Sequence, residues 1–190
     1  MASRSSLVAG VAVCVSLLSA TGGSEPVRAL PDDEAFLSLD FEAFDQTPET
    51  GWRPLDRRGE YLEAAHLIDA YRERRAGLDG GEHTILAFHD AQEYAFAGRD
   101  ETALERLSQA EYPSAALDRQ PSEDKAFGLA WNAYVQATAA FLRHDRKRLS
   151  ELREVIARAP LLNGKPMNLD VVDRLLAHFD ESYKVAYGSP

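Results

Sequence analysis

Residues 95–107 read AFAGRDETALERL and residues 140–152 read AFLRHDRKRLSEL, and the likeness of these two stretches decides the fold. Ala, Phe, Asp and both Leu coincide at one constant offset. A fainter third copy, GEYLEAAHLI, begins at Gly59. Repeated helix-turn-helix units cannot bury their apolar faces alone, so they stack on one another. The repeats therefore predict an all-α fold, a short array of antiparallel helical hairpins.

Apolar side chains recur at intervals of three and four residues through most of the chain after Pro54, as in amphipathic helices. We expect Gly98 to end one helix in a left-handed turn, Asp100 to cap the next helix, and the pair 144–145 to repeat that turn. No segment alternates regularly between apolar and polar residues, so we expect essentially no sheet. The predicted helices cover residues 59–76, 82–97, 102–110, a long helix opening at Ser122, 146–159 and 168–187. The aromatic residues that we expect in the core of the long helix are Phe127, Trp131, Tyr134 and Phe141.

The first 22 residues have the pattern of a secretory signal peptide. Arg4 supplies a positive end, and the apolar run from Leu7 to Ala20 is too short to span a bilayer as a mature helix. Cys14 is the single cysteine and follows Val13 rather than the small residue that a lipoprotein would have. We therefore expect a bacterial exported protein, periplasmic or secreted, whose mature chain has no thiol. An uncleaved anchor or a wrongly assigned start remains the alternative.

The charge balance argues against two classes of partner. The chain has 21 Lys and Arg against 31 Asp and Glu, which gives a formal net charge of −10. An acidic protein of this kind repels nucleic acid and anionic membranes. We therefore expect a protein or peptide partner, and neither nucleic acid nor a membrane after signal cleavage.

Residues 23–54 form an acidic, proline-containing arm ahead of a helical domain at residues 55–188. Seven carboxylates and no Lys or Arg lie between Pro31 and Trp52, with apolar side chains interleaved among them. One interpretation is an extended, partly ordered arm lying on the domain. The other is an acidic and aromatic segment that docks on a partner, or on a groove of its own domain as a lid.

The segment from Gly59 to Pro160 resembles tetratricopeptide-type repeats. An aromatic residue, a turn glycine, a small alanine and aliphatic residues have the spacing of that family at Tyr94, Gly98, Ala103, Leu104, Leu107 and Ala110. In the second copy Arg143 replaces the turn glycine and Arg148 replaces the small alanine, whereas Leu149, Leu152 and Pro160 fit. The resemblance implies a short right-handed array in which residues 168–187 cap the last hairpin. Residues 88–92 also resemble uncharacterised bacterial exported proteins of this shape, which implies no known activity.

The resemblance further implies that the first helix of each hairpin builds a concave, peptide-binding face. On the long helix four polar residues share roughly one face, and we predict them as the partner-binding row: Lys125, Asn132, Gln136 and Arg143. The chain also has a dense basic cluster of Arg143, His144, Arg146, Lys147 and Arg148. That cluster is a solvated surface, a dock for the acidic arm, or a contact for an acidic partner.

The leading interpretation is a non-catalytic scaffold or adaptor, without a cofactor. The chain has no His-Glu-x-x-His motif, glycine-rich phosphate loop, Gly-x-Ser-x-Gly motif or thiol nucleophile in its mature part. The competing hypothesis is a helical metal-dependent phosphohydrolase that uses His66, His89, Asp90 and Asp145, whose order matches the HD class. A smaller metal site of His89, Asp90 and Glu93 is a further alternative, because these side chains share a helix face.

Overall fold

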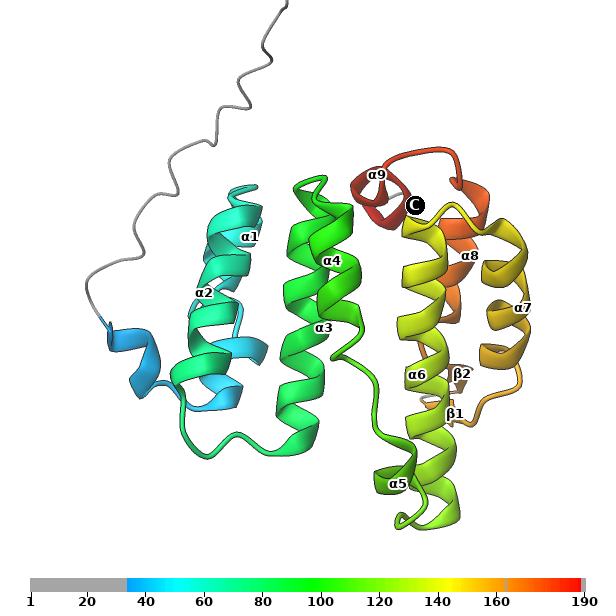
Figure 1. Cartoon of the computed structure of the whole chain (residues 1–190), viewed down its shortest axis with the longest axis horizontal. Coiled ribbons are helices and arrows are strands. Elements are labelled where there is room, and N and C mark those ends of the chain that lie inside the picture. The colour runs from blue at the N-terminus through cyan, green and yellow to red at the C-terminus, as the bar shows by residue number, and fades with distance from the viewer. Residues whose placement is uncertain (1–33, 163, 189–190) are drawn as a thin grey trace, which may run out of the picture.

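The computed structural model describes residues 34–162 and 164–188. The predicted signal peptide and the first part of the acidic arm, residues 23–33, lie outside the described residues. Within them the predicted all-α class is confirmed (Figure 1). The helices are α1 (Arg53–Arg57), α2 (Tyr61–Arg74), α3 (Gly80–Phe96), α4 (Asp100–Leu107), α5 (Ser114–Leu117), α6 (Ser122–Leu142), α7 (Arg146–Ile156), α8 (Leu169–Ala177) and α9 (Tyr183–Gly188).

Two short elements depart from the predicted helices and loops. The segment predicted as a loop around residues 160–166 contains a two-stranded antiparallel hairpin of β1 (Leu161–Leu162) and β2 (Lys165–Pro166). The predicted last helix over 168–187 is wrong, because it breaks between α8 and α9. At this break Phe179 turns inward and is buried, while the neighbouring acidic residues stay exposed. The break allows α9 to fold back against α3 instead of extending into solvent.

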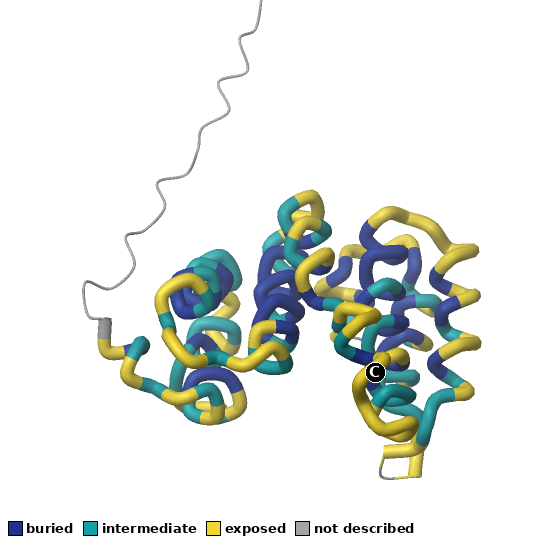
Figure 2. Tube along the Cα trace, turned by 60° about the horizontal axis from the view of Figure 1, so that its bottom comes forward, coloured by how far each residue is buried: buried dark blue, intermediate teal, exposed yellow. Residues whose placement is uncertain are grey.

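The helices pack with their neighbours in sequence. Helix α3 lies between α2 and α4, and α6 packs along α7, which in turn contacts α8. Figure 1 shows α1 to α4 at one side of the molecule and α6 to α8 at the other, with α9 crossing between them at one end. The segment that leads from α4 to α6 contains α5 and runs along α6. Figure 2 shows buried residues concentrated where helices face one another, whereas the connecting loops are exposed.

The two hairpin turns are built alike but in a different register from the sequence repeat. Gly98 has φ +69° and His144 has φ +55°, so His144, not Arg143, occupies the left-handed position. The residue after each closes the turn by donating its N–H five residues back, at 2.8 Å in both turns. Asp145 is the residue before α7 and accepts the Arg148 N–H at 2.9 Å, whereas Asp100 is already helical and caps nothing. The prediction that Asp100 caps its helix is therefore wrong.

This shift of one residue changes which side chains are equivalent. Leu149, rather than Arg148, stands at the place of Ala103, and both of these residues are fully buried. Arg148 therefore does not have to fit between packed helices, and its side chain is about half exposed. A single extra residue before the turn moves the whole second helix around by about 100°, which carries Arg148 out of the interface.

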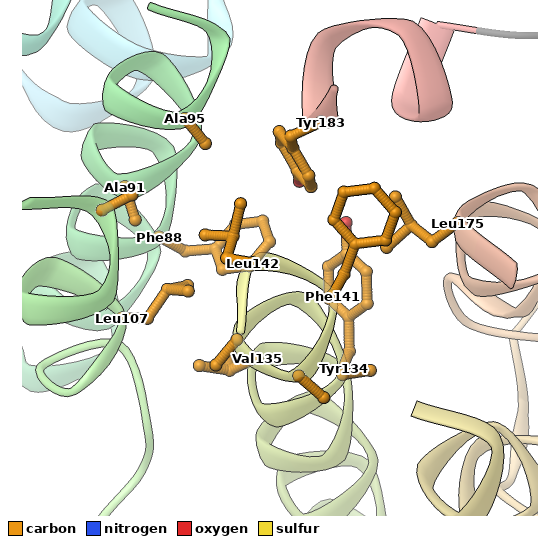
Figure 3. Close-up of a cluster of buried hydrophobic side chains, with 14 of the residues drawn as sticks. Phe88, Ala91, Ala95, Leu107, Tyr134, Val135, Phe141, Leu142, Leu175 and Tyr183 are labelled. Carbon is orange, nitrogen blue, oxygen red and sulfur yellow. The ribbon is translucent and has the colours of Figure 1, made fainter. Parts of the chain in front are cut away.

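The apolar core has two parts, and α3 contributes to both. The larger part joins α3, α4, α6, α7, α8 and α9. Figure 3 shows Tyr134 and Phe141 of α6 meeting Phe88, Leu175 and Tyr183 from three other helices. These two aromatic residues of α6 are buried as predicted, but Phe127 and Trp131 are only half-buried. The smaller part lies between α2, α3 and the segment before α1.

The described part of the acidic arm, residues 34–54, contributes its apolar side chains to that smaller core. It forms two single turns, Glu34–Ser38 and Glu42–Gln46. The ring of Phe44 is fully buried and stacks on Tyr71 of α2, with ring centroids 3.6 Å apart. The arm therefore docks on α2 and α3, and the structure does not place these acidic residues on the basic cluster at residues 143–148.

Candidate functional site

Helix α3 carries a buried polar face in the middle of the molecule. Asp90 is fully buried, and its Oδ2 lies 3.1 Å from Arg72 Nη1 and 2.9 Å from Arg106 Nε. Arg106 also binds Asp69 at 2.8 Å, so two carboxylates face two guanidiniums. Burial, together with the neighbouring Asp69 carboxylate, raises the pKa of Asp90 to about 8. This network adds buried polar contacts to the apolar contacts that hold α2, α3 and α4 together.

On the neighbouring face of α3, His89 is held by the docked arm. Asp45 is fully buried, and its Oδ1 accepts hydrogen bonds from Trp52 Nε1 at 2.9 Å and from His89 Nδ1 at 2.8 Å. Arg53 Nε donates to the Asp45 carbonyl at 2.7 Å. Burial alone would raise the pKa of Asp45, but the contacts with His89, Trp52 and Arg53 together lower it below its ordinary value. The arm is thus fixed by a buried, hydrogen-bonded carboxylate.

Glu93 lies one turn after His89 and has no such partner. Its side chain is 1% exposed, and its Oε2 makes no hydrogen bond with the described residues. Burial, together with the nearby Asp56, raises the pKa of Glu93 to about 9. The carboxyl group is therefore protonated at neutral pH, and burying it uncharged avoids the much larger penalty of a buried anion.

Each of the four residues of the metal-hydrolase hypothesis has partners of its own. His66 lies against the edge of Tyr94 with ring centroids 6.2 Å apart, and His89 binds Asp45. Asp90 binds Arg72 and Arg106, and Asp145 caps α7. In the part of the chain that the structure describes, no three His, Cys, Asp or Glu side chains are arranged to hold a metal ion, which includes the smaller set around Glu93. The geometry gives these residues structural roles.

The predicted partner-binding row is divided between different tasks. Lys125 forms an ion pair with Asp118 at 2.7 Å. Asn132 binds the backbone of Tyr112 twice, accepting from its N–H at 2.8 Å and donating to its carbonyl at 2.9 Å. Gln136 donates to Glu111 Oε2 at 2.9 Å. Arg143 is exposed, and its guanidinium has no partner among the described residues.

These contacts fasten a strap, residues 110–112, across α6. Trp131 Nε1 donates to the Ala110 carbonyl at 2.8 Å, so three consecutive strap residues are held by three side chains of α6. Two cavities lie along α6, one lined by Tyr112 and the other by Glu111 of the strap, and their linings share no residue. We name them the apolar cavity and the arginine cavity.

The apolar cavity has a volume of about 440 Å³ and lies between α3, α5 and the first half of α6. Its walls are mostly apolar and include Ile85, Tyr112, Leu117, Phe127, Trp131 and Met167. Asp124 is the one acidic residue of its lining. Gly128 forms part of the wall, and a Cβ added to it would lie 2.4 Å from Leu117 Cδ2, so glycine is what lets α5 approach this closely.

The arginine cavity has a volume of about 300 Å³ and lies between α4, the second half of α6 and the turn into α7. Its floor is apolar, and Arg143 and Arg148 stand at its mouth together with Gln136. Arg148 Nη2 donates to Gln136 Oε1 at 3.0 Å. Two members of the predicted row, Gln136 and Arg143, are therefore brought together here, while Lys125 and Asn132 are not.

Sequence reasoning missed both cavities. The signals available were the half-buried aromatic residues Phe127 and Trp131 and the mid-helix Gly128, each of which looks like ordinary core until the position of α5 is known.

Comparison with protein-family models, with curated proteins and with solved structures gives no match. Among the described residues no helix is both long enough and apolar enough to span a membrane.

Proposed function

We propose that this protein is an exported, non-catalytic adaptor with a tetratricopeptide-like helical array. Its task is to bind a peptide segment of a protein partner. The apolar cavity receives a long apolar side chain of that segment, and the partner residues next to this side chain are Lys or Arg. The observation that carries the proposal is the cavity itself. Preformed concave sites with apolar, aromatic walls and a few polar groups are the usual binding sites of proteins.

The walls of the apolar cavity favour an aliphatic or aromatic anchor. Phe127 and Trp131 are half-buried in the free chain, so a side chain inserted between them removes apolar surface from water. Full burial of one such side chain contributes about 1.5–3 kcal/mol. Trp131 is already fixed by its hydrogen bond to the Ala110 carbonyl and by its edge-to-face contact with Phe88, whose ring centroid lies 5.2 Å from that of Trp131. Binding therefore requires little reordering of these rings.

The charge around the apolar cavity favours a cationic flank on the partner. Asp124 lines the cavity and Glu123 is exposed beside it, whereas Lys125 pairs with Asp118 and the exposed Arg119 donates to the Ala115 carbonyl. The whole chain has a net charge of −10, which attracts basic segments and repels acidic ones.

The test uses two capped pentapeptides with a central Phe, one with Lys on both sides of it and one with Glu. Binding to the purified chain is measured by fluorescence anisotropy. We expect the Lys peptide to bind more tightly, and Asp124→Lys to weaken it about three- to fivefold, as for a rim charge. Glu123→Lys is the matched control, because Glu123 is exposed but does not line the cavity, and we expect a smaller effect.

A second pair of variants tests the anchor. Phe127→Ala removes a wall of the cavity, and we expect it to weaken peptide binding about tenfold or more. Leu129→Ala serves as its control, because Leu129 is 51% exposed and is not part of the cavity lining. If both variants bind the Lys peptide like the unmodified chain, the apolar cavity is not the binding site.

A further inference from the structure

We infer that the arginine cavity is a second, separate binding site, and that its ligand is a carboxylate on a short aliphatic body. The ligand is either a free branched acid or the last residue of a peptide with its terminal carboxylate. This inference does not depend on the proposed function, because the linings of the two cavities share no residue.

The floor of the arginine cavity suits an aliphatic group. Leu107 and Val135 are buried there, and Ala139 and Ala140 leave room because their side chains are short. The volume of about 300 Å³ corresponds to roughly ten water molecules at about 30 Å³ each. A ligand of about eight non-hydrogen atoms therefore fits, which is the size of a branched six-carbon acid.

The mouth of the arginine cavity carries the guanidiniums of Arg143 and Arg148 and the carboxylates of Glu111 and Asp145. Glu111 accepts a hydrogen bond from Gln136, Asp145 accepts one from the Arg148 backbone, and Arg148 Nη1 lies 3.5 Å from Glu151 Oε2, so none of these carboxylates pairs with Arg143. Arg143 has no partner among the described residues, so its guanidinium is available for a carboxylate at no loss of an existing contact. A guanidinium binds a carboxylate with paired, charge-assisted hydrogen bonds.

The first hairpin has no counterpart of this mouth. In the register of the turns, Ala97 and Thr102 stand where the second hairpin has Arg143 and Arg148. The arginines are therefore not required by the hairpin turn as such. They also belong to the densest cationic run of an acidic chain, where the local field concentrates small anions.

The experiment is a titration of the isotopically labelled full chain, followed by backbone amide chemical shifts. Four probes are used: 4-methylpentanoate, 4-methylpentanamide, a tetrapeptide of three glycines and a final leucine with a free carboxylate, and the same tetrapeptide as its C-terminal amide. In at least one pair, the carboxylate probe must shift the backbone amide signals around Ala139 until they saturate. The carboxamide probe of the same pair must leave these signals unchanged. The pair that responds tells a free acid from a peptide terminus.

Arg143→Gln should weaken binding of the responding acid about tenfold, as expected for losing a charged hydrogen-bond partner. Lys147→Gln is the matched control, because it removes the same charge from the same run at a side chain that is 89% exposed and outside the cavity. Acid and amide binding equally, no saturable shift with any probe, or equal effects of the two variants would each overturn the inference. Binding of the Lys pentapeptide to the apolar cavity is measured in the same Arg143→Gln sample and should be unchanged, so failure at one cavity is distinguishable from failure at the other.

Discussion

Glu93→Gln should stabilise the protein, and the gain should grow with pH. The side chain is 1% exposed, and its pKa is raised from 4.5 to about 9 by burial and by nearby Asp56. Between these two values the folded state keeps a proton that the unfolded state gives up. The free energy of unfolding therefore falls as pH rises through this window, by up to about 1.4 kcal/mol per pH unit. Glutamine has the same shape and stays neutral, so it removes this dependence.

The magnitude follows from the distance between pH 7 and the ordinary pKa of a glutamate. A pH of 7 is about 2.5 units above the pKa of the carboxyl in the unfolded chain, whereas the carboxyl in the folded chain is still protonated. This difference corresponds to about 3 kcal/mol of lost stability. We expect Glu93→Gln to recover most of it at pH 7 and to change stability by less than about 1 kcal/mol near pH 4.5. Above about pH 9 the difference should level off.

The assay is urea unfolding followed by far-ultraviolet circular dichroism across this pH range, for the unmodified chain, Glu93→Gln and Glu105→Gln. Glu105 is exposed on α4 and serves as the control whose substitution leaves the pH profile unchanged. A stability difference between the unmodified chain and Glu93→Gln that stays constant with pH would refute the reasoning. So would a loss of stability in Glu93→Gln at pH 7, since it would mean that the charged form is the one stabilised.

Three further predictions concern the turns, the arm and the apolar cavity. Gly98→Ala should lower the unfolding free energy by about 1 kcal/mol because of its positive φ, whereas His144→Gly should raise it slightly, and thermal denaturation of both variants compares the two turns. Phe44→Ala should destabilise the whole molecule by about 3–4 kcal/mol in a single urea transition, because that ring is fully buried on α2; a loss below about 1 kcal/mol would show that the arm is detachable. Gly128→Ala should displace Leu117 and weaken binding of the Lys pentapeptide while changing stability by less than about 1 kcal/mol, since better helix propensity offsets the contact. Unchanged peptide affinity in that variant would mean that α5 does not shape the cavity.

The helical parts of the fold were predictable because their signals are local. Three- and four-residue spacing of apolar side chains gives α2, α3, α6 and α7 their positions, and Gly98 marks its turn because a positive φ favours glycine. The second turn shows where a repeat in the letters misleads. Matching side chains at one offset made Arg143 the turn residue, but the backbone puts His144 there. Matching the leucines of the two copies hides the one residue that is inserted before the second turn.

The candidate site was predictable only in part, for a related reason. The structure brings Gln136 and Arg143 of the predicted row together at the arginine cavity, but what each side chain of the row does depends on which segment packs against it. The strap at residues 110–112 comes from a loop with no periodic signal, and it takes Asn132 and Gln136 as its anchors. Likewise His89 looked like a metal ligand until the arm placed Asp45 2.8 Å away.

The sequence by itself determined the helix class, most helix positions, the acidic balance and the absence of thiols after Cys14, since these depend on residue type and short-range spacing. Tertiary structure alone decided that the arm is part of the core, that α9 folds back on α3, and that α6 lines both an apolar cavity and an arginine-rimmed cavity. Those outcomes depend on contacts between residues far apart in the chain. Such contacts are selected by the summed burial and pairing of whole surfaces, which no local pattern records.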